Sequence, residues 1–168
     1  GPGDESLSLG AVYSYLYDTF GYKKCLQYIK PLKNAYLGPN ISKSSIDSFK
    51  KNKLIKKNFK LISDKNYDHV AKSLQKGEII FVCIGRQEFG QRALGHRSII
   101  CDPSKLELVK KINSSIKMRD FWMPFTPSIL DTKLKKYVNL NKKLNYNYMT
   151  SCVEATEAGK LDLKAAIH

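Results

Sequence analysis

The residues best suited to chemistry in this sequence are the arginines and glycines of residues 85–98. Within 13 residues there are three of each, namely Arg86, Arg92, Arg97, Gly85, Gly90 and Gly95. Glycine lets the backbone approach a ligand closely or adopt a positive φ. Arginine presents a planar fork of donors that matches two oxygens of a phosphate or carboxylate. The stretch therefore predicts an anion-binding loop; the alternative that stays open is a surface hairpin with solvated arginines.

Two apolar runs must position this loop. Residues 78–84 form a continuous apolar run, which predicts a strand buried on both faces. Residues 98–101 form the second run, and Asp102-Pro103 marks a turn after it. Ser104 followed by Glu107 is a capping-box pattern, so we expect a helix from there to about residue 115.

A second cationic segment follows at residues 116–130. It contains two cations, three aromatic residues and two prolines: Lys117, Arg119, Phe121, Trp122, Phe125, Pro124 and Pro127. The prolines exclude a helix over its second half. The segment is suited to lining a pocket, and a buried aromatic loop is the alternative.

The overall charge favours anionic partners. The chain has 168 residues, a length typical of one domain, with 42% hydrophobic residues, a net charge of +14 and a pI near 9.6. Nucleotides, phosphates, nucleic acid or an acidic surface would suit it. Much of the charge is lysine at 50–60 and 133–143, and such runs are more often solvated faces than binding sites.

The cysteines do not indicate a metal site. Cys25, Cys83, Cys101 and Cys152 form no C-x-x-C pair and lie near no histidine cluster, so we expect no metal. Cys83 and Cys101 are expected in the core. No signal peptide or long apolar span is present, so we expect a cytoplasmic protein with no membrane partner.

Helix signals dominate the first half of the chain. Apolar residues of 7–20 recur at helical spacing, and Gly21 is placed to end that helix. Ser42 is expected to cap a helix to Phe49, before an exposed lysine-rich stretch at 50–58 and a short strand at 59–62.

A second set of signals surrounds the loop. Asp64 is expected to cap a helix over 65–76, with Gly77 as its stop. That helix should direct three residues inward: Val70, Ala71 and Leu74. Further along the chain, Asp131 is expected to cap a short basic helix to Val138.

Residues 149–155 are expected to form a strand, and 165–168 the start of another. This alternation predicts an α/β or α+β domain with a mixed sheet.

The order of residues 85–98 resembles the nodulation and antibiotic O-carbamoyltransferase family, whose pattern there is G-R-x-E-x-G-P-R-A-L-G-N-R-S. The likeness continues at Asp102-Pro103, Ile112-Asn113, Lys117, Arg119 and 124–128, and reaches back to 36–39 and 7–11. It covers nearly the whole chain, and its central motif is long and specific.

The resemblance implies an enzyme with two domains. Residues 1–22 would be the tail of a first, ASKHA-like domain that carries iron or another metal. Residues 23–168 would be part of a YrdC-like domain, with a twisted mixed parallel and antiparallel sheet flanked by helices. This second domain would use ATP, with magnesium, and carbamoyl phosphate as co-substrate to form carbamoyl-adenylate. The first domain would then transfer the carbamoyl group to a small-molecule hydroxyl acceptor.

The resemblance also implies roles for particular residues. Arg92 and Lys117 match the positions best placed to contact the phosphate or carbamoyl group and are the catalytic candidates. The remaining ligand-binding candidates are Arg86, Arg97, Ser98 and Arg119. We expect Glu88 to pair with an arginine and orient it, and the alternative is a general base.

Three departures from the family pattern bear on these expectations. Gln91 and His96 stand where the family commonly has Pro and Asn, and Met123 stands where many members have Arg. The chain also stops before later family segments, so we expect weak or no turnover from it alone. A homodimer is one expected state.

Two other functions stay open: a basic YrdC-like module that binds RNA without catalysis, and a scaffold. The basic stretches are expected to lack the interleaved exposed aromatics of a stacking platform, so nucleic acid is the less favoured partner.

Overall fold

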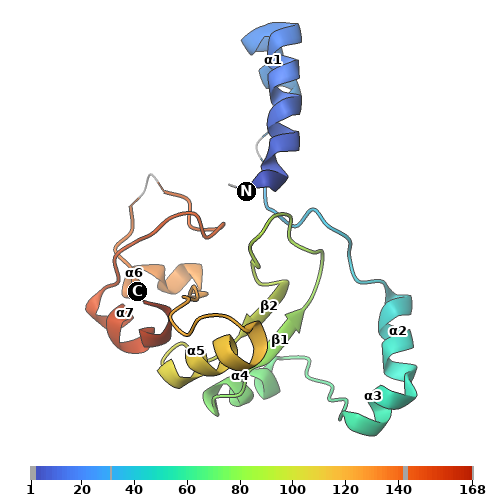
Figure 1. The fold of residues 1–168 in the computed structure, drawn as a ribbon, viewed down its shortest axis with the longest axis vertical. Helices are drawn as coiled ribbons and strands as arrows, with labels where there is room; N and C mark the ends of the chain where they lie inside the picture. Colours follow the sequence, from blue (N-terminus) through green and yellow to red (C-terminus); the bar gives the residue numbers. More distant parts are fainter. Residues whose placement is uncertain (1–2, 31, 142–143, 168) are drawn as a thin grey trace.

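The computed structural model describes residues 3–30, 32–141 and 144–167 and shows helices around one small sheet (Figure 1). The predicted mixed α/β class is confirmed. The α-helices are α1 (Leu7–Tyr28), α2 (Lys43–Lys51), α3 (Lys53–Asn58), α4 (Asp68–Gln75), α5 (Leu106–Ile112), α6 (Leu134–Tyr137) and α7 (Glu157–Asp162). The strands are β1 (Ile80–Cys83) and β2 (Arg97–Ile100). The short helical turns are η1 (Asp4–Ser6), η2 (Asn113–Lys117, a π-helical turn), η3 (Asp131–Lys133) and η4 (Lys164–Ala166).

The sheet is an antiparallel pair whose register runs from Ile80 opposite Ile100 to Cys83 opposite Arg97. Within the described ranges no parallel pair joins it, so the parallel strands expected of a YrdC-like sheet are not among these residues. A strand does form within 78–84 as predicted, but the prediction that both of its faces are buried is wrong. Burial alternates along β1, and Phe81 is 66% exposed, because only one face of the pair is covered.

The core lies where α5 meets the C-terminal turns. Leu108, Ile112, Leu163 and Ala165 are buried there, and the Ala165 amide donates to the Pro103 carbonyl at 2.8 Å. The strand expected at 165–168 is therefore wrong for 165–166, which lie in η4; His168 lies outside the described residues. The expected core cysteines are also wrong. Cys83 is exposed and Cys101 half-buried, whereas Cys25 is buried.

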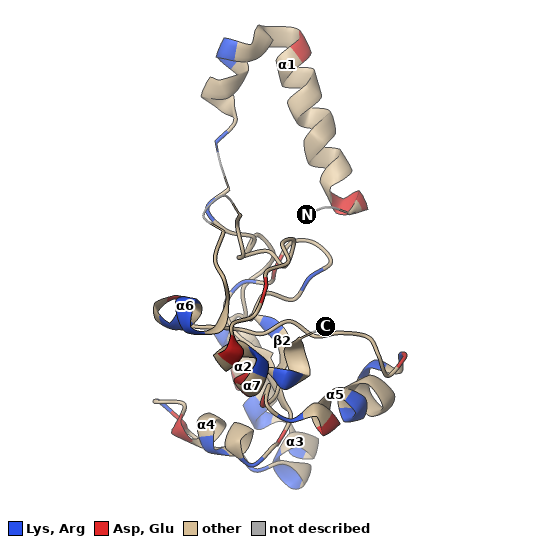
Figure 2. Cartoon of the chain, turned by 90° about the vertical axis from the view of Figure 1, so that its left-hand side faces the viewer, with Lys and Arg blue, Asp and Glu red and all other residues tan. Residues whose placement is uncertain are grey.

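Helix α1 stands away from the other elements (Figure 1). Gly21 interrupts it with φ +71° and ψ 165°, so the predicted break is correct, although helical structure resumes and continues to Tyr28. Residues 7–17 of α1 carry no Lys, Arg, Asp or Glu, so this half of the helix is uncharged (Figure 2). Its charged residues, Asp18, Lys23 and Lys24, lie around the break at Gly21. Tyr15, Tyr17 and Tyr22 are more than half exposed.

The cap predictions succeed in the first half of the chain. The Ser42 hydroxyl accepts from the Ser45 amide at 3.0 Å and begins α2, as predicted. Asp64 accepts from the amides of His69 and Val70, so it caps α4, although that helix begins at Asp68. The strand expected at 59–62 is absent from these residues, because this extended segment has no ladder partner.

The buried face of α4 differs in part from the prediction. Val70 and Leu74 are half-buried as expected, but Ala71 is exposed and Ser73 is buried instead. The predicted stop is correct, because Gly77 has φ +84° directly after the helix.

Caps in the second half differ from the prediction. Ser104 donates its hydroxyl to Asp102 at 2.7 Å, so the predicted capping box does not form and α5 begins after Lys105 without a side-chain cap. Leu130, rather than Asp131, precedes the first turn of the basic helix. Residues 149–155 form only an isolated bridge, Val138 with Ala155, because they run beside a short connection rather than a strand.

Candidate functional site

The loop between β1 and β2 is the predicted anion loop, and it rises from the sheet toward the N-terminal residues (Figure 1). The Ile84 amide donates to the His96 carbonyl at 3.0 Å and closes the base of the loop. Gly85 has φ +50°, and a Cβ there would lie 3.0 Å from the His96 ring. Glycine is therefore required at this base both for its backbone conformation and for close packing.

Glu88 holds the loop together from inside. Its side chain is only 8% exposed, and Oε1 accepts from the amides of Leu94 at 2.8 Å, His96 at 2.7 Å and Arg97 at 3.1 Å. Burial by itself raises the pKa of Glu88, but these backbone hydrogen bonds outweigh it and lower the pKa to about 2. The expected pairing with a guanidinium is not formed: this carboxylate orients backbone amides instead.

Two of the predicted ligand-binding arginines bind backbone carbonyls. Arg97 donates to the carbonyls of Ile84 at 2.6 Å and Gly85 at 3.2 Å, which fastens the two sides of the loop base. Arg86 donates to Leu37 at 2.6 Å and Gly38 at 2.9 Å. The sequence pattern does not separate these structural roles from ligand contacts, because the carbonyl partners of Arg86 lie almost 50 residues away.

The segment 35–40 runs along the loop as a clamp. The Gly38 amide donates to the Gln87 carbonyl at 2.9 Å, and the Gln87 amide donates to the Pro39 carbonyl at 3.0 Å. The Tyr36 hydroxyl donates to the Leu94 carbonyl at 2.8 Å. The Tyr36 ring also stacks on His96, with centroids 3.7 Å apart and planes at 12°. Loop and clamp are thus one preorganised unit.

Arg92 differs from its two neighbours. It is exposed at the far end of the loop, and its guanidinium makes no hydrogen bond or ion pair within the described part of the chain. Ser98, also predicted as a ligand contact, accepts from the Gly95 amide at 2.9 Å. It therefore supports the turn that precedes β2.

The second cationic segment is organised by Asn113, which has no solvent exposure. Its amide nitrogen donates to the carbonyls of Phe121 at 3.2 Å and Met123 at 2.9 Å, and its Oδ1 accepts from Arg119 Nε at 2.7 Å. The Arg119 guanidinium also lies 4.6 Å from the Phe125 ring centroid. The family resemblance includes Asn113, but no role was predicted for it, and its place at the end of the apolar repeat of the predicted helix was the available signal for burial.

Lys117 ends the π-helical turn just before this loop. It is exposed, and its ammonium has no partner among the residues that the structure describes. Arg119, by contrast, is half-buried. Of the predicted site cations, Arg92 and Lys117 are thus the two whose charged groups make no hydrogen bond or ion pair with any described residue.

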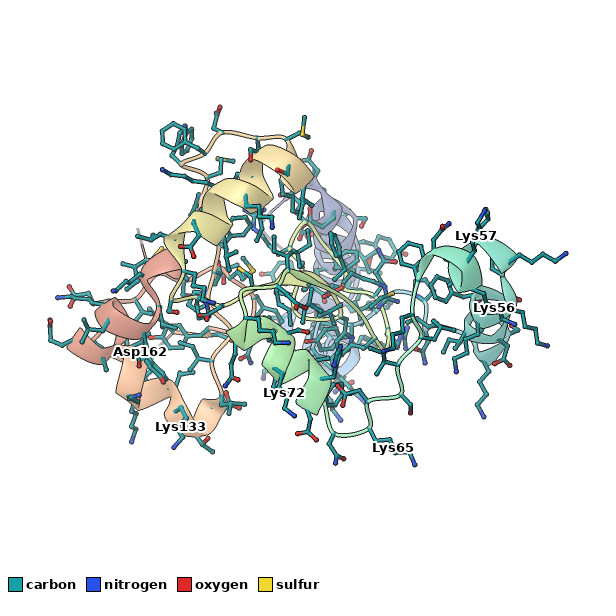
Figure 3. All side chains as sticks on the ribbon, turned by 90° about the horizontal axis from the view of Figure 1, so that it is seen from below. Lys56, Lys57, Lys65, Lys72, Lys133 and Asp162 are labelled. Carbon is teal, nitrogen blue, oxygen red and sulfur yellow. The ribbon has the colours of Figure 1, made fainter. Side chains whose placement is uncertain are left out.

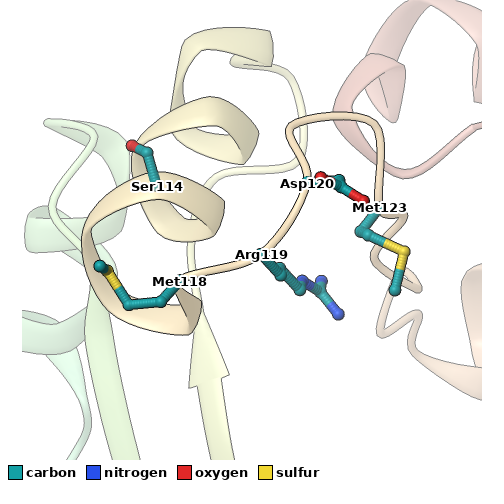
Figure 4. A pocket seen from close by; sticks show the side chains of 5 residues that line it. All are labelled: Ser114, Met118, Arg119, Asp120 and Met123. Atoms are coloured by element: carbon teal, nitrogen blue, oxygen red, sulfur yellow. The ribbon is translucent and has the colours of Figure 1, made fainter.

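Two hollows adjoin these elements. One of about 480 Å³ is lined by Ser114, Met118, Arg119, Asp120 and Met123, and Arg119 and Met123 extend to the same side of the loop (Figure 4). The other, of about 420 Å³, is lined by Leu32, Lys33, Asn34, Tyr36, Leu37, Arg86 and His96. Both volumes fall within the range of small-ligand sites.

The electrostatics of the site are positive. Lys105–Asp102, Lys136–Asp162 and Lys160–Glu157 are the described ion pairs, and all three lie outside it. Glu5 lies beside the loop, with Oε1 3.2 Å from the place that a Cβ of Gly90 would occupy. The described residues contain no group of three or more His, Cys, Asp or Glu side chains arranged to hold a metal ion. None of their helices is long and apolar enough to cross a membrane.

Comparison with known proteins places the chain among carbamoyltransferases. Residues 71–168 match the family model described as the carbamoyltransferase C-terminus. An uncharacterised protein of Methanocaldococcus jannaschii is 35% identical over 136 residues, 80% of this chain and 22% of that protein.

Two nodulation proteins are also similar. NolNO of Sinorhizobium fredii is 33% identical over 58% of this chain and 15% of its own length, and NolO of Bradyrhizobium diazoefficiens is 38% identical over 46% and 14%. The chain therefore spans between 14% and 22% of the length of these three relatives.

Proposed function

This chain belongs to the carbamoyltransferase family through its C-terminal domain, and from that premise we propose that it supplies the carbamoyl phosphate and ATP site of an O-carbamoyltransferase. In this proposal water cleaves carbamoyl phosphate to carbamate and inorganic phosphate. A carbamate oxygen then attacks the α-phosphorus of ATP, which forms carbamoyl-adenylate and expels pyrophosphate. A hydroxyl acceptor receives the carbamoyl group in the other, ASKHA-like domain, and AMP is released.

The observation that carries the proposal is the contrast among the cations. Arg86, Arg97 and Arg119 donate to groups of the chain itself, and these bonds fix the two loops. Arg92 and Lys117 are exposed and have no such partners among the described residues, and they lie on loops held by a buried Glu88 and a buried Asn113. Rigid loops that present unneutralised cations are suited to multiply charged ligands.

This chemistry needs no protein nucleophile. Neutralising the phosphates and holding the carbamate in line with the α-phosphorus supply most of the effect. Losing one well-placed donor of this kind costs about 3 kcal/mol of transition-state stabilisation. We assign Arg92 and Lys117 to this role, whereas Arg86, Arg97, Ser98 and Arg119 support ligand contacts mainly by shaping the loops.

Magnesium fits this site as a companion of ATP. Mg²⁺ commonly binds through one or two carboxylates together with substrate phosphates, so it needs no cluster of acids. Asp120 is the carboxylate that lines the hollow beside Arg119. When bound, the ion would neutralise phosphate charge; any further metal, such as iron, is proposed only for the ASKHA-like domain.

We also propose that residues 1–22 pack with that first domain. Most of α1 is exposed, and three tyrosines, Tyr15, Tyr17 and Tyr22, face solvent at more than half of their surface. Such aromatic surface is typical of a face that another element covers. Paired copies of the chain, the homodimer of the sequence prediction, would cover it as well.

The test titrates the 168-residue chain with carbamoyl phosphate and ATP, separately and together. We expect Arg92→Ala and Lys117→Ala to weaken binding at least tenfold, and the control Lys65→Ala, which changes a remote exposed lysine, to leave it unchanged. Carbamoyl phosphate affinity that is the same in all four proteins would remove both residues from the site. In a protein that joins this domain to the family's first domain, ATP–pyrophosphate exchange should require carbamoyl phosphate, and equal exchange without it would exclude the adenylation step.

One observation favours the RNA-binding alternative. Phe49 and Phe59 flank the lysine-rich stretch at 50–58 and are 55% and 64% exposed, so exposed rings lie beside this stretch although none is interleaved within it. Lys56 and Lys57 extend away from α3 in the same region (Figure 3). Exposed rings among lysines suit single-stranded nucleic acid. Filter binding to a single-stranded RNA should then weaken steeply with salt, and no measurable binding at low salt would exclude this alternative.

A further inference from the structure

The hollow beside the clamp has a composition that differs from that of the Arg119 hollow. Its lining includes two cations, Lys33 and Arg86, and two aromatic rings, Tyr36 and His96, and no acidic residue. The rings and cations suit a ligand that is planar at one end and anionic at the other. At about 420 Å³ the space exceeds the needs of carbamoyl phosphate and is of the size that holds a nucleotide.

The rings are held in place on both sides. The Tyr36 hydroxyl donates to the Leu94 carbonyl at 2.8 Å. The His96 ring bonds through Nδ1 to the Arg86 carbonyl at 2.7 Å, and a carbonyl only accepts, so Nδ1 carries the proton. Gly85 leaves room for the same ring. A stack fixed in this way loses little freedom when a third ring packs against it.

The cations retain free donors. Arg86 uses Nε and Nη2 to bind Gly38 and Leu37, and its Nη1 makes no hydrogen bond within the described ranges. Lys33 is exposed, and its ammonium has no partner among these residues. Both charges are therefore available to a phosphate.

We propose that this hollow binds an adenine nucleotide, with the base against the Tyr36–His96 stack and a phosphate at Arg86 and Lys33. The inference rests on the proposed function for the identity of the nucleotide and deepens it by assigning the base a place. It also makes His96 a determinant of nucleotide binding that is particular to this chain. Where the family pattern has Asn, a side-chain amide keeps the bond to the Arg86 carbonyl but provides no ring to stack.

The experiment follows binding of AMP and of inorganic phosphate to the chain and to three variants. His96→Asn should weaken AMP binding about 5- to 150-fold, the range for losing one base–aromatic stack, and leave phosphate binding unchanged. Lys33→Met should weaken both ligands by roughly two- to fivefold, as for an exposed charge pair. Lys65→Met, a matched loss of an exposed lysine far along the chain, should change neither.

A second readout reports the base directly. The imidazole proton resonances of His96, assigned by their loss in His96→Asn, should shift on addition of AMP through the ring current of the base. Phosphate alone should not produce that shift. Unchanged AMP affinity in His96→Asn, or AMP binding without a shift of these resonances, would overturn the proposal.

The outcome separates this inference from the proposed function. In one outcome, carbamoyl phosphate binding depends on Arg92 and Lys117 but AMP binding does not depend on His96. This outcome would support the proposed function and exclude nucleotide binding in this hollow. AMP binding that depends on His96, without any carbamoyl phosphate binding, would keep the nucleotide site and exclude the carbamoyl assignment.

Discussion

Oε1 of Glu88 lies 2.7 Å from the backbone nitrogen of His96, and this bond draws the two sides of the candidate loop together around one buried carboxylate. The same oxygen accepts from the amides of Leu94 and Arg97. The loop is thus organised from within by an anion, whereas its exposed surface is cationic. The arginine side chains point elsewhere, so the negative charge of Glu88 is stabilised by backbone dipoles.

Replacing Glu88 by Gln should destabilise the chain. Gln keeps an acceptor oxygen at this place but loses the negative charge that makes these hydrogen bonds strong. Its NH₂ group also takes the place of one buried carboxylate oxygen. We expect the free energy of unfolding in urea to fall by about 1–3 kcal/mol. The matched control is Glu78→Gln, because Glu78 is an exposed acid just before β1. This substitution should change the free energy of unfolding by less than about 0.5 kcal/mol. An equal effect of the two substitutions would contradict the role of Glu88.

The pKa of Glu88 also predicts how stability depends on pH. The folded pKa of about 2 lies below the ordinary value of 4.5, so the ionised form is favoured by folding. Its contribution is complete above pH 4.5 and is lost as the pH falls from there toward 2. A shift of this size corresponds to about 3 kcal/mol.

Urea unfolding between pH 6 and pH 2 measures this dependence. The difference in unfolding free energy between the chain and Glu88→Gln should shrink as the pH falls, because protonation removes the charge that the substitution removes. A difference that stays constant over this range would show that Glu88 has an ordinary pKa in the folded chain.

Much of the loop was predictable from sequence, because it depends on residues that lie close together in the chain. The glycines and arginines between two apolar runs indicated a loop between two strands, and the anion binding expected of it stays a prediction. Gly21, Ser42 and Asp64 act at the helix ends as their local chemistry requires. Each of these features depends on residues within a few positions of one another.

The features that were missed depend on distant partners. Arg86 binds carbonyls at 37 and 38, and the residues that hold the second loop meet around Asn113; neither partnership has a local pattern. Burial of β1 was overestimated because an apolar run reports what could be covered, and here one face of the strand pair has no covering element. The failed strands at 59–62 and 149–155 have suitable composition but no partner strand.

Replacing Arg97 should lower the stability of the chain, whereas replacing Arg92 should not. The Arg97 guanidinium makes hydrogen bonds to the carbonyls of Ile84 and Gly85, whereas that of Arg92 makes none within the described residues. Arg97→Ala is expected to lower the unfolding free energy by about 1–2 kcal/mol, and Arg92→Ala to leave it within about 0.5 kcal/mol. Thermal or urea unfolding of the two variants checks this, and a large loss of stability in Arg92→Ala would show that its side chain has a structural partner.

Asn113 gives the sharpest test of the second loop. Its buried amide donates to two carbonyls and accepts from Arg119, so Asn113→Asp removes both donated bonds and turns a carboxylate toward the carbonyls of Phe121 and Met123. We expect a loss of about 2–4 kcal/mol in unfolding free energy, because a buried charge would face two acceptors with one cationic partner. Ser115→Ala, an exposed change two residues away, is the control. If the loop positions Lys117 for ligand, a milder variant that still folds, Asn113→Ser, should also weaken carbamoyl phosphate binding, and full affinity in that variant would show that Lys117 acts independently of the buried amide.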